Sequence, residues 1–307
     1  MRTILLTSLL ALATTLTGNA EPMTARVLDH RIIHGIDVNG ETMAELSGLA
    51  YDAKNRSIYA VSDRATLFSL AFSTDGRVIT ALEPKAAFKL TDVHGNALVD
   101  QGFGPEALML QHDETGELNF AILSESGPRA ALFDHNGGWL EDIDLPPAVR
   151  DSSRQAGKNR GLESIARDPA LGLVTLPEEP FEPAPRTAHT LYAENGQTFS
   201  WSSDDIGASR VKAMTTLTDG KLLVLERVKQ GKALIPYLRL VDLEACTTEF
   251  ACKTHATRVD VPGIDDADFE GLVAVAPSLF FLVSDDKIRK KQRSVFALVE
   301  LKFSETP

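Results

Sequence analysis

The chain has 307 residues, of which 43% are hydrophobic, and its formal net charge is −12. This length and apolar content are sufficient for a large core within one domain. The negative charge argues against nucleic acid and anionic membrane surfaces as partners, because both repel an acidic protein. An acidic chain is compatible with hard cations such as calcium.

Residues 1–20 have the features of a secretory signal peptide. Arg2 supplies the positive start, an apolar run extends from Ile4 to Leu16, and small residues follow at Gly18-Asn19-Ala20. The apolar run is too short to span a membrane. We therefore predict a mature protein of residues 21–307 that is periplasmic or secreted and is not inserted in a membrane.

Two cysteines occur in the chain, Cys246 and Cys252. A closely spaced pair in an exported protein favours a disulfide, here across a loop between two strands. A zinc site would need further ligands, and no other cysteine is present to supply them.

A short motif recurs along the chain, in which a carboxylate precedes small and aliphatic residues. Its charged positions are Glu45, Glu106, Glu163 and Glu270, with Lys212 in a degenerate copy. Each copy is followed by an apolar run that ends in acidic residues, namely Asp63, Glu125, Glu178 with Glu179, Glu226, and Asp285 with Asp286. The spacing of roughly 50 to 60 residues suits one four-stranded blade of a β-propeller.

The pattern of strands and turns predicts an all-β chain that forms a single propeller of five blades, with six as the alternative. The first blade has strand candidates at 46–51, 57–62, 67–72 and 78–90. The last blade has room for only three strands, at 272–276, 279–284 and 294–303. An N-terminal strand at 25–33 precedes the first motif, so we expect it to complete the last blade and close the ring. The proline-rich segment 177–185 is not expected to form a central strand.

The first strand of each propeller blade lines the central axis, so equivalent residues at its start converge on the mouth of the channel. At an effective dielectric near 20, two like charges about 4 Å apart repel by about 4 kcal/mol, so the ring needs a cation, a basic partner or a raised pKa. Calcium binds six to eight oxygens and would suit such a ring. The predicted metal ligands are Glu45, Glu106, Glu163, Glu270 and Asp63. The alternative is structural: the carboxylates accept backbone N–H groups of the next blade.

Other catalytic motifs are absent from the sequence. It has no Gly-x-Ser-x-Gly elbow, no phosphate-binding glycine loop and no His-Glu-x-x-His helix. The histidines show no spacing typical of metal ligands. Asp265 to Asp268 is a candidate calcium loop, although solvated acidic loops are more common.

The order of these motifs resembles the bacterial phytase-like family, also called the esterase-like-activity-of-phytase family. The residues that carry the resemblance are Leu46-Ser47-Gly48-Leu49-Ala50-Tyr51-Asp52, Tyr59-Ala60-Val61-Ser62-Asp63, Pro105-Glu106-Ala107-Leu108, Asn159-Arg160-Gly161-Leu162-Glu163, Leu222-Leu223-Val224-Leu225-Glu226-Arg227, Asp268-Phe269-Glu270-Gly271-Leu272 and Leu282-Val283-Ser284-Asp285-Asp286. The resemblance implies an exported β-propeller that hydrolyses phosphoesters or esters with calcium. The second repeat departs from the family pattern, with Glu-Ala-Leu in place of Glu-Gly-Ile or Glu-Gly-Leu.

Two functions are compatible with these patterns. The first is a calcium-dependent phosphoesterase that acts at the mouth on a small, phosphorylated molecule. Its predicted catalytic residues are Arg160, Glu163, Lys212 and Arg227. Its predicted substrate-binding residues are Arg64, Glu226 and Asp285. The second is a non-catalytic propeller that binds a ligand or a partner at the same mouth, since no nucleophile stands out. We expect a monomer in either case.

Overall fold

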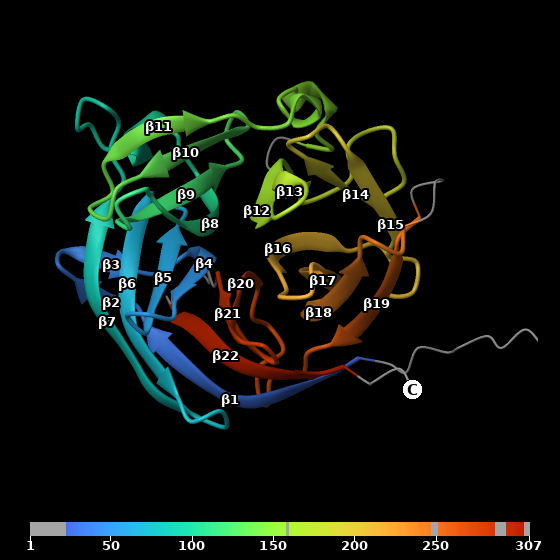
Figure 1. Ribbon diagram of the computed structural model, residues 1–307. Coiled ribbons are helices and arrows are strands. Elements are labelled where there is room, and N and C mark those ends of the chain that lie inside the picture. The colour runs from blue at the N-terminus through green and yellow to red at the C-terminus, as the bar shows by residue number, and fades with distance from the viewer. Residues whose placement is uncertain (1–22, 158–159, 247–250, 286–292, 304–307) are drawn as a thin grey trace, which may run out of the picture.

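The computed structural model describes residues 23–157, 160–246, 251–285 and 293–303. The predicted signal peptide, Asn159 and Asp286 lie outside these ranges. The described chain forms five four-stranded antiparallel sheets arranged around a central axis, which confirms the five-bladed propeller (Figure 1). Its helices among these residues are three short 3₁₀ turns, η1 (Leu98–Gln101), η2 (Pro147–Val149) and η3 (Ser152–Arg154).

Four blades are simple meanders in which each strand pairs with the next along the chain. Blade one contains β4 (Leu46–Asp52), β5 (Ser57–Ser62), β6 (Thr66–Thr74) and β7 (Ile79–Lys89). Blade two contains β8 (Pro105–His112), β9 (Leu118–Ser124), β10 (Arg129–Phe133) and β11 (Trp139–Ile143). Blade three contains β12 (Leu162–Asp168), β13 (Gly172–Pro177), β14 (Ala188–Ala193) and β15 (Thr198–Ser202). Blade four contains β16 (Arg210–Thr216), β17 (Leu222–Gln230), β18 (Ala233–Asp242) and β19 (Lys253–Arg258).

Blade five is assembled from both ends of the described chain, as predicted. Its strand order is β1-β22-β21-β20, from β1 (Thr24–His34), β22 (Arg293–Lys302), β21 (Leu279–Ser284) and β20 (Phe269–Ala276). Strand β1 runs antiparallel to β22 from Thr24 opposite Lys302 to His34 opposite Arg293. A small hairpin of β2 (Ile36–Val38) and β3 (Glu41–Met43) then leads to blade one. Its turn, Asn39-Gly40, has positive φ at both residues, as a tight hairpin turn requires.

The core is divided among the seams between blades. Five clusters of buried apolar side chains each join one blade to the next. The first strands β4, β8, β12, β16 and β20 contact their neighbours around the axis. Two glycines permit this close approach. A Cβ on Gly48 would lie 2.6 Å from Leu108 N, and one on Gly271 would lie 2.6 Å from Ser47 O.

Two local predictions are also confirmed. Cys246 and Cys252 form a disulfide across the connection between β18 and β19. Of the proline-rich segment 177–185, Pro177 ends β13, and the rest separates β13 from β14 without forming a strand. Among the described residues there is no helix with the length and apolar character needed to cross a membrane.

Candidate active site at the axial mouth

A bulge near the start of each first strand sets the geometry of the mouth. In four blades the pairing skips one residue, and the skipped residue is Glu106, Glu163, Lys212 or Glu270. A bulge leaves its extra residue outside the ladder and redirects its side chain. In blade one the irregularity spans Leu46 to Leu49.

The register identifies Ser47, rather than Glu45, as the member from blade one. Leu46 pairs with Ser62 as Phe269 pairs with Ser284, so the next residue, Ser47, matches Glu270. The backbone agrees, because the carbonyl of Glu45 accepts from Asp63 N at 3.0 Å, as that of Asp268 accepts from Asp285 N at 2.8 Å. We name Ser47, Glu106, Glu163, Lys212 and Glu270 the first ring.

A second set of side chains belongs to the second strand of each blade or comes just after it. In each blade this residue follows the one that pairs with the position before the first-ring member, and in blade four it lies within β17 and pairs with Arg210. The members of this set are Asp63, Glu125, Glu178, Arg227 and Asp285, which we name the second ring. Both rings lie at the same pole, because Lys212 of the first ring contacts Glu178 of the second at 2.9 Å. Each ring has one basic member, and both basic members come from blade four.

Glu226, which we predicted to bind substrate, lies one position too early to join the second ring. It pairs with Val211 in the ladder, and neighbouring residues of a strand point to opposite faces. Its side chain is fully buried, where it accepts hydrogen bonds from Arg239 Nε at 2.7 Å and Ser209 Oγ at 3.0 Å. Glu226 therefore does not line the mouth.

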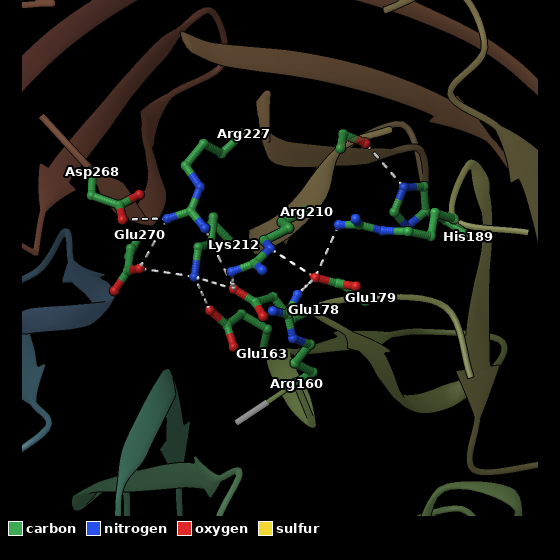
Figure 2. Close-up of polar contacts among 12 residues, drawn as sticks. Arg160, Glu163, Glu178, Glu179, His189, Arg210, Lys212, Arg227, Asp268 and Glu270 are labelled. Carbon is green, nitrogen blue, oxygen red and sulfur yellow. Dashed lines mark hydrogen bonds and ion pairs between the residues drawn. The ribbon is translucent and has the colours of Figure 1, made fainter. Parts of the chain in front are cut away.

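Lys212 is the centre of the charged network (Figure 2). Its Nζ contacts the carboxylates of Glu163, Glu178 (2.9 Å) and Glu270 (2.8 Å), and its side chain is only 4% exposed. Arg227 lies beside it, contacts Asp268 and approaches Glu270 to 3.8 Å and Glu178 to 3.7 Å. Three of the predicted catalytic residues, Glu163, Lys212 and Arg227, are thus brought together.

The pKa values of Glu163 and Glu178 shift in opposite directions because the two carboxylates face different numbers of cations. Burial raises the pKa of Glu163 well above its usual range, although Lys212 opposes the shift. Burial acts in the same direction on Glu178, but Lys212, Arg210 and Arg227 outweigh it and lower its pKa. Burial opposes the charge of Lys212, yet Glu163, Glu270 and Glu178 hold its pKa well above the usual value.

Two half-buried carboxylates occupy the part of the mouth that blade two supplies. Burial, followed by the charges of Glu163 and Asp63, raises the pKa of Glu106 well above its usual range. Burial and the charge of Glu178 raise the pKa of Glu125, whose carboxylate accepts a hydrogen bond from the Gly161 N–H. Within the described part of the chain, Glu106 has no hydrogen bond or ion pair. Both groups therefore hold a proton at a higher pH than an ordinary glutamate does.

Basic residues gather at the mouth between blades three and four. Arg160 precedes β12, Arg186 lies between β13 and β14, and Arg210 begins β16. All three guanidinium groups contact one oxygen, Oε1 of Glu179, with Arg210 Nε at 2.8 Å and Arg186 Nη2 at 3.1 Å. We name these three residues the arginine cluster (Figure 2 labels Arg160, Arg210 and Glu179).

The remaining predicted residues take separate positions. Glu45 forms a two-bond ion pair with Arg64, at 3.0 and 3.1 Å. Asp63 accepts a hydrogen bond from Ser47 Oγ at 2.6 Å, and Asp285 is buried in the second ring. Sequence reasoning missed Arg186, which lies in an irregular crossing, and Arg210. Arg210 stands two residues before the first-ring member of its blade, as Gly161 and Asp268 do in theirs. An alignment of the repeats could therefore have identified it.

The ring carboxylates do not present a ready calcium site. In the described ranges, no three or more Asp, Glu, His or Cys side chains are grouped so that they could hold a metal ion. The Lys212 ammonium takes the central position between Glu163 and Glu270. The predicted calcium dependence stays a prediction, and the chemistry proposed below takes no step through a metal.

The channel narrows directly below the two rings. A cavity of only about 20 Å³ lies between the first strands, beside Glu106, Leu49, Leu108 and Leu272. Further along the axis it widens to about 270 Å³, lined mainly by apolar residues such as Met109 and Val273. Mainly apolar side chains therefore line both cavities between the first strands.

Comparison with known proteins places the chain in a family. The family model named phytase-like, described as esterase-like activity of phytase, matches residues 41–292. A search of curated proteins finds no significant match.

Solved structures with a similar fold are distant. The PQQ-bound aldose sugar dehydrogenase of Streptomyces coelicolor is 11% identical, with 91% of this chain and 98% of that chain covered and a TM-score of 0.49. Extracellular domains 1–2 of Drosophila semaphorin 1b are 14% identical, with 85% of this chain and 51% of that chain covered and a TM-score of 0.40. The Pan2 WD40 domain of Neurospora crassa is 7% identical, with 92% of this chain and 98% of that chain covered and a TM-score of 0.38. None of these likenesses supports an argument about function. The family match covers most of the propeller, from β3 to beyond β21, and the chain therefore belongs to the phytase-like family.

Proposed function

We propose that the protein is an exported hydrolase of phosphoesters, or of related esters, that acts at the axial mouth. The observation that carries the proposal is the double ring, which gathers proton-exchanging carboxylates and permanently charged cations at one pole. The family match supports ester hydrolysis in general. The disulfide favours an oxidising compartment, in agreement with export.

Glu106 is assigned as the general acid. Its carboxyl has a raised pKa, caused first by burial and then by the surrounding acids, so it holds a proton at a pH where an ordinary glutamate is ionised. It also keeps part of its surface open to the mouth. A carboxylic acid in this state can protonate the leaving alcohol oxygen as the ester bond breaks.

Glu125 is assigned as the general base. Its pKa is raised by burial and by Glu178, while the Gly161 N–H holds the carboxylate in position. It accepts a proton from water as the water oxygen bonds to phosphorus, and Glu106 gives a proton to the departing oxygen. One P–O bond forms and one breaks, so atoms and charge balance and the two carboxyl groups exchange protonation states.

Lys212 and Arg227 supply fixed positive charge next to the reacting group. Both stay protonated, since the neighbouring carboxylates raise the pKa of each against the effect of burial. Preorganised charges in a partly buried site stabilise negative charge that develops in a transition state. Glu163, held by Lys212, is assigned a supporting role in positioning that ammonium group.

A second function is favoured by the internal pairing of the network. Lys212 already contacts three carboxylates and is almost fully buried, so the network also suits a rigid, non-catalytic binding surface. Such a propeller would bind a small ligand or a partner without turnover. Sustained hydrolysis of any substrate by purified protein would exclude this alternative.

Hydrolysis by the purified protein tests the proposal directly. A panel of p-nitrophenyl phosphate, inositol phosphates and p-nitrophenyl acetate is assayed with the unaltered protein and with Glu106→Gln. General acid catalysis contributes about 100-fold or more when an alcohol leaves, so we expect kcat on inositol phosphates to fall by at least about that factor, and kcat on the p-nitrophenyl esters to fall less because p-nitrophenolate leaves without a proton. Glu117→Gln is the matched control, because Glu117 is an exposed residue in a turn of the same blade. Equal kcat on inositol phosphates for the unaltered protein and Glu106→Gln would refute the assignment.

A further inference from the structure

The arginine cluster holds more positive charge than its own carboxylate can neutralise. Arg160, Arg186 and Arg210 all contact Oε1 of Glu179. The neighbouring Glu178 is shared, since Lys212 and Arg227 contact it in addition to Arg210 at 3.4 Å. Within these contacts, three guanidinium groups therefore face only one carboxylate that they do not share with Lys212 and Arg227.

The guanidinium groups are also open to solvent, whereas the carboxylate beneath them is not. The side chain of Glu179 is 4% exposed, against 60% for Arg186, 33% for Arg160 and 28% for Arg210. Each guanidinium carries five N–H donors, and one carboxylate oxygen can use few of them. Glu179 Oε1 has no hydrogen bond of acceptable geometry within the described residues, so these contacts are ionic. Donors therefore remain available for an acceptor from solvent.

Electrostatics supports the same interpretation. Burial, followed by the positive charge of Arg210, lowers the pKa of Arg160. Arginine does not lose its proton in proteins, so this shift records burial of the guanidinium group together with repulsion from Arg210. A bound anion would relieve the repulsion, and phosphate matches the planar donor fork of arginine.

The segment that carries Arg160 adjoins the proposed general base. The residue after Arg160 is Gly161, whose N–H donates to the carboxylate of Glu125. Arg160, Arg186 and Arg210 come from three separate segments that meet at the seam between blades three and four, so the folded ring is needed to form the cluster.

We propose that Arg160, Arg186 and Arg210 bind a phosphate group of the substrate, and that Glu179 is the internal counter-charge that holds the three guanidinium groups together before substrate arrives. This inference rests on the proposed function and deepens it, because it names the substrate class as phosphate esters rather than neutral esters. Arg186 is then a specificity-determining residue. No repeat in the sequence indicates it, because it lies in an irregular crossing.

Binding of inorganic phosphate to the full protein tests the inference without any need for turnover. Isothermal titration at low ionic strength compares the unaltered protein with Arg186→Gln and Arg210→Gln. We expect the dissociation constant for phosphate to rise by about tenfold or more in each variant, as a lost charge-assisted contact predicts. Arg26→Gln is the control, since Arg26 is an exposed arginine on β1 that is paired with Glu300. Phosphate binding no stronger than that of chloride, or unaffected by both variants, would overturn the inference.

Kinetics separates this inference from the proposed function. If p-nitrophenyl phosphate is hydrolysed, Arg186→Gln should raise KM for that substrate and leave KM for p-nitrophenyl acetate unchanged. Phosphate binding that depends on Arg186 without any hydrolysis would support the site and refute the hydrolase. Hydrolysis of the phosphate ester with the same KM in Arg186→Gln would support the hydrolase and refute the site.

Discussion

Removal of Lys212 is the most direct test of the charged network. Lys212→Met keeps a side chain of similar length but removes the cation that Glu163, Glu178 and Glu270 share, in a site where the lysine is 4% exposed. Loss of one partner from a buried ion pair costs about 3–5 kcal/mol, because the remaining charge is left uncompensated. We expect a loss of that size in the free energy of unfolding at pH 8, measured by urea denaturation.

The loss should shrink as the pH falls. In the unaltered protein the pKa of Lys212 is raised by folding. The stability that its charge contributes is therefore complete below the pKa of the unfolded state, 10.5, and is constant between pH 5 and 8. In the variant, the pKa of Glu163 rises further because its cation is gone. A carboxylate with a raised folded pKa favours the folded state as it gains a proton, so the variant should recover stability from pH 8 to pH 5.

Two comparisons give this experiment its controls. Lys221→Met removes an exposed lysine paired with Asp219, and exposed pairs contribute less than about 1 kcal/mol. The double variant Lys212→Met with Glu163→Gln should regain part of the lost stability, since it removes one uncompensated charge. A loss below about 1 kcal/mol for Lys212→Met, or an equal loss at pH 5 and pH 8, would refute the network as described.

Three further predictions follow from the same structure. Glu106→Gln should raise the free energy of unfolding by an amount that grows as pH rises above 4.5, because the raised pKa of Glu106 makes its ionisation unfavourable to the folded state. An unchanged free energy of unfolding between pH 4.5 and 8, measured by urea denaturation, would contradict this. Arg239→Met should lower the free energy of unfolding by about 3–5 kcal/mol, since it leaves Glu226 buried without its cation. The double variant with Glu226→Leu should regain much of that stability, and an Arg239→Met variant as stable as the parent would disprove the prediction. Calcium in 100-fold excess over its dissociation constant would stabilise the protein by about 2.7 kcal/mol, so identical melting curves with calcium and with chelator would end the calcium prediction.

The architecture was predictable because the repeated motif and the strand pattern are local signals. The strands of blade one were expected at 46–51 and 57–62, and β4 and β5 occupy Leu46–Asp52 and Ser57–Ser62. The role of the N-terminal strand followed from the three-stranded last blade, since a missing edge needs a partner.

The side-chain assignments were less accurate because strand register decides them residue by residue. Alignment by charge alone placed Glu45 in the first ring, but the bulge in blade one puts Ser47 there. Glu226 was predicted to line the mouth, but a difference of one residue along the strand places its side chain in the core. Arg186 could not be found, since a crossing without strand or repeat carries no periodic signal to place it.

The pairing of β1 with β22 has a consequence for how the molecule is made. Thr24 and Lys302 are neighbours in space but almost the full chain apart in sequence, so the ring cannot close until nearly all of the polypeptide has been synthesised. Contacts of such long sequence separation form slowly. Until β22 has been synthesised, β1 has no partner strand, and its unpaired edge is a site where chains could pair with one another. Loss of a few residues at either end of this pairing would therefore impair the yield of folded protein more than its chemistry.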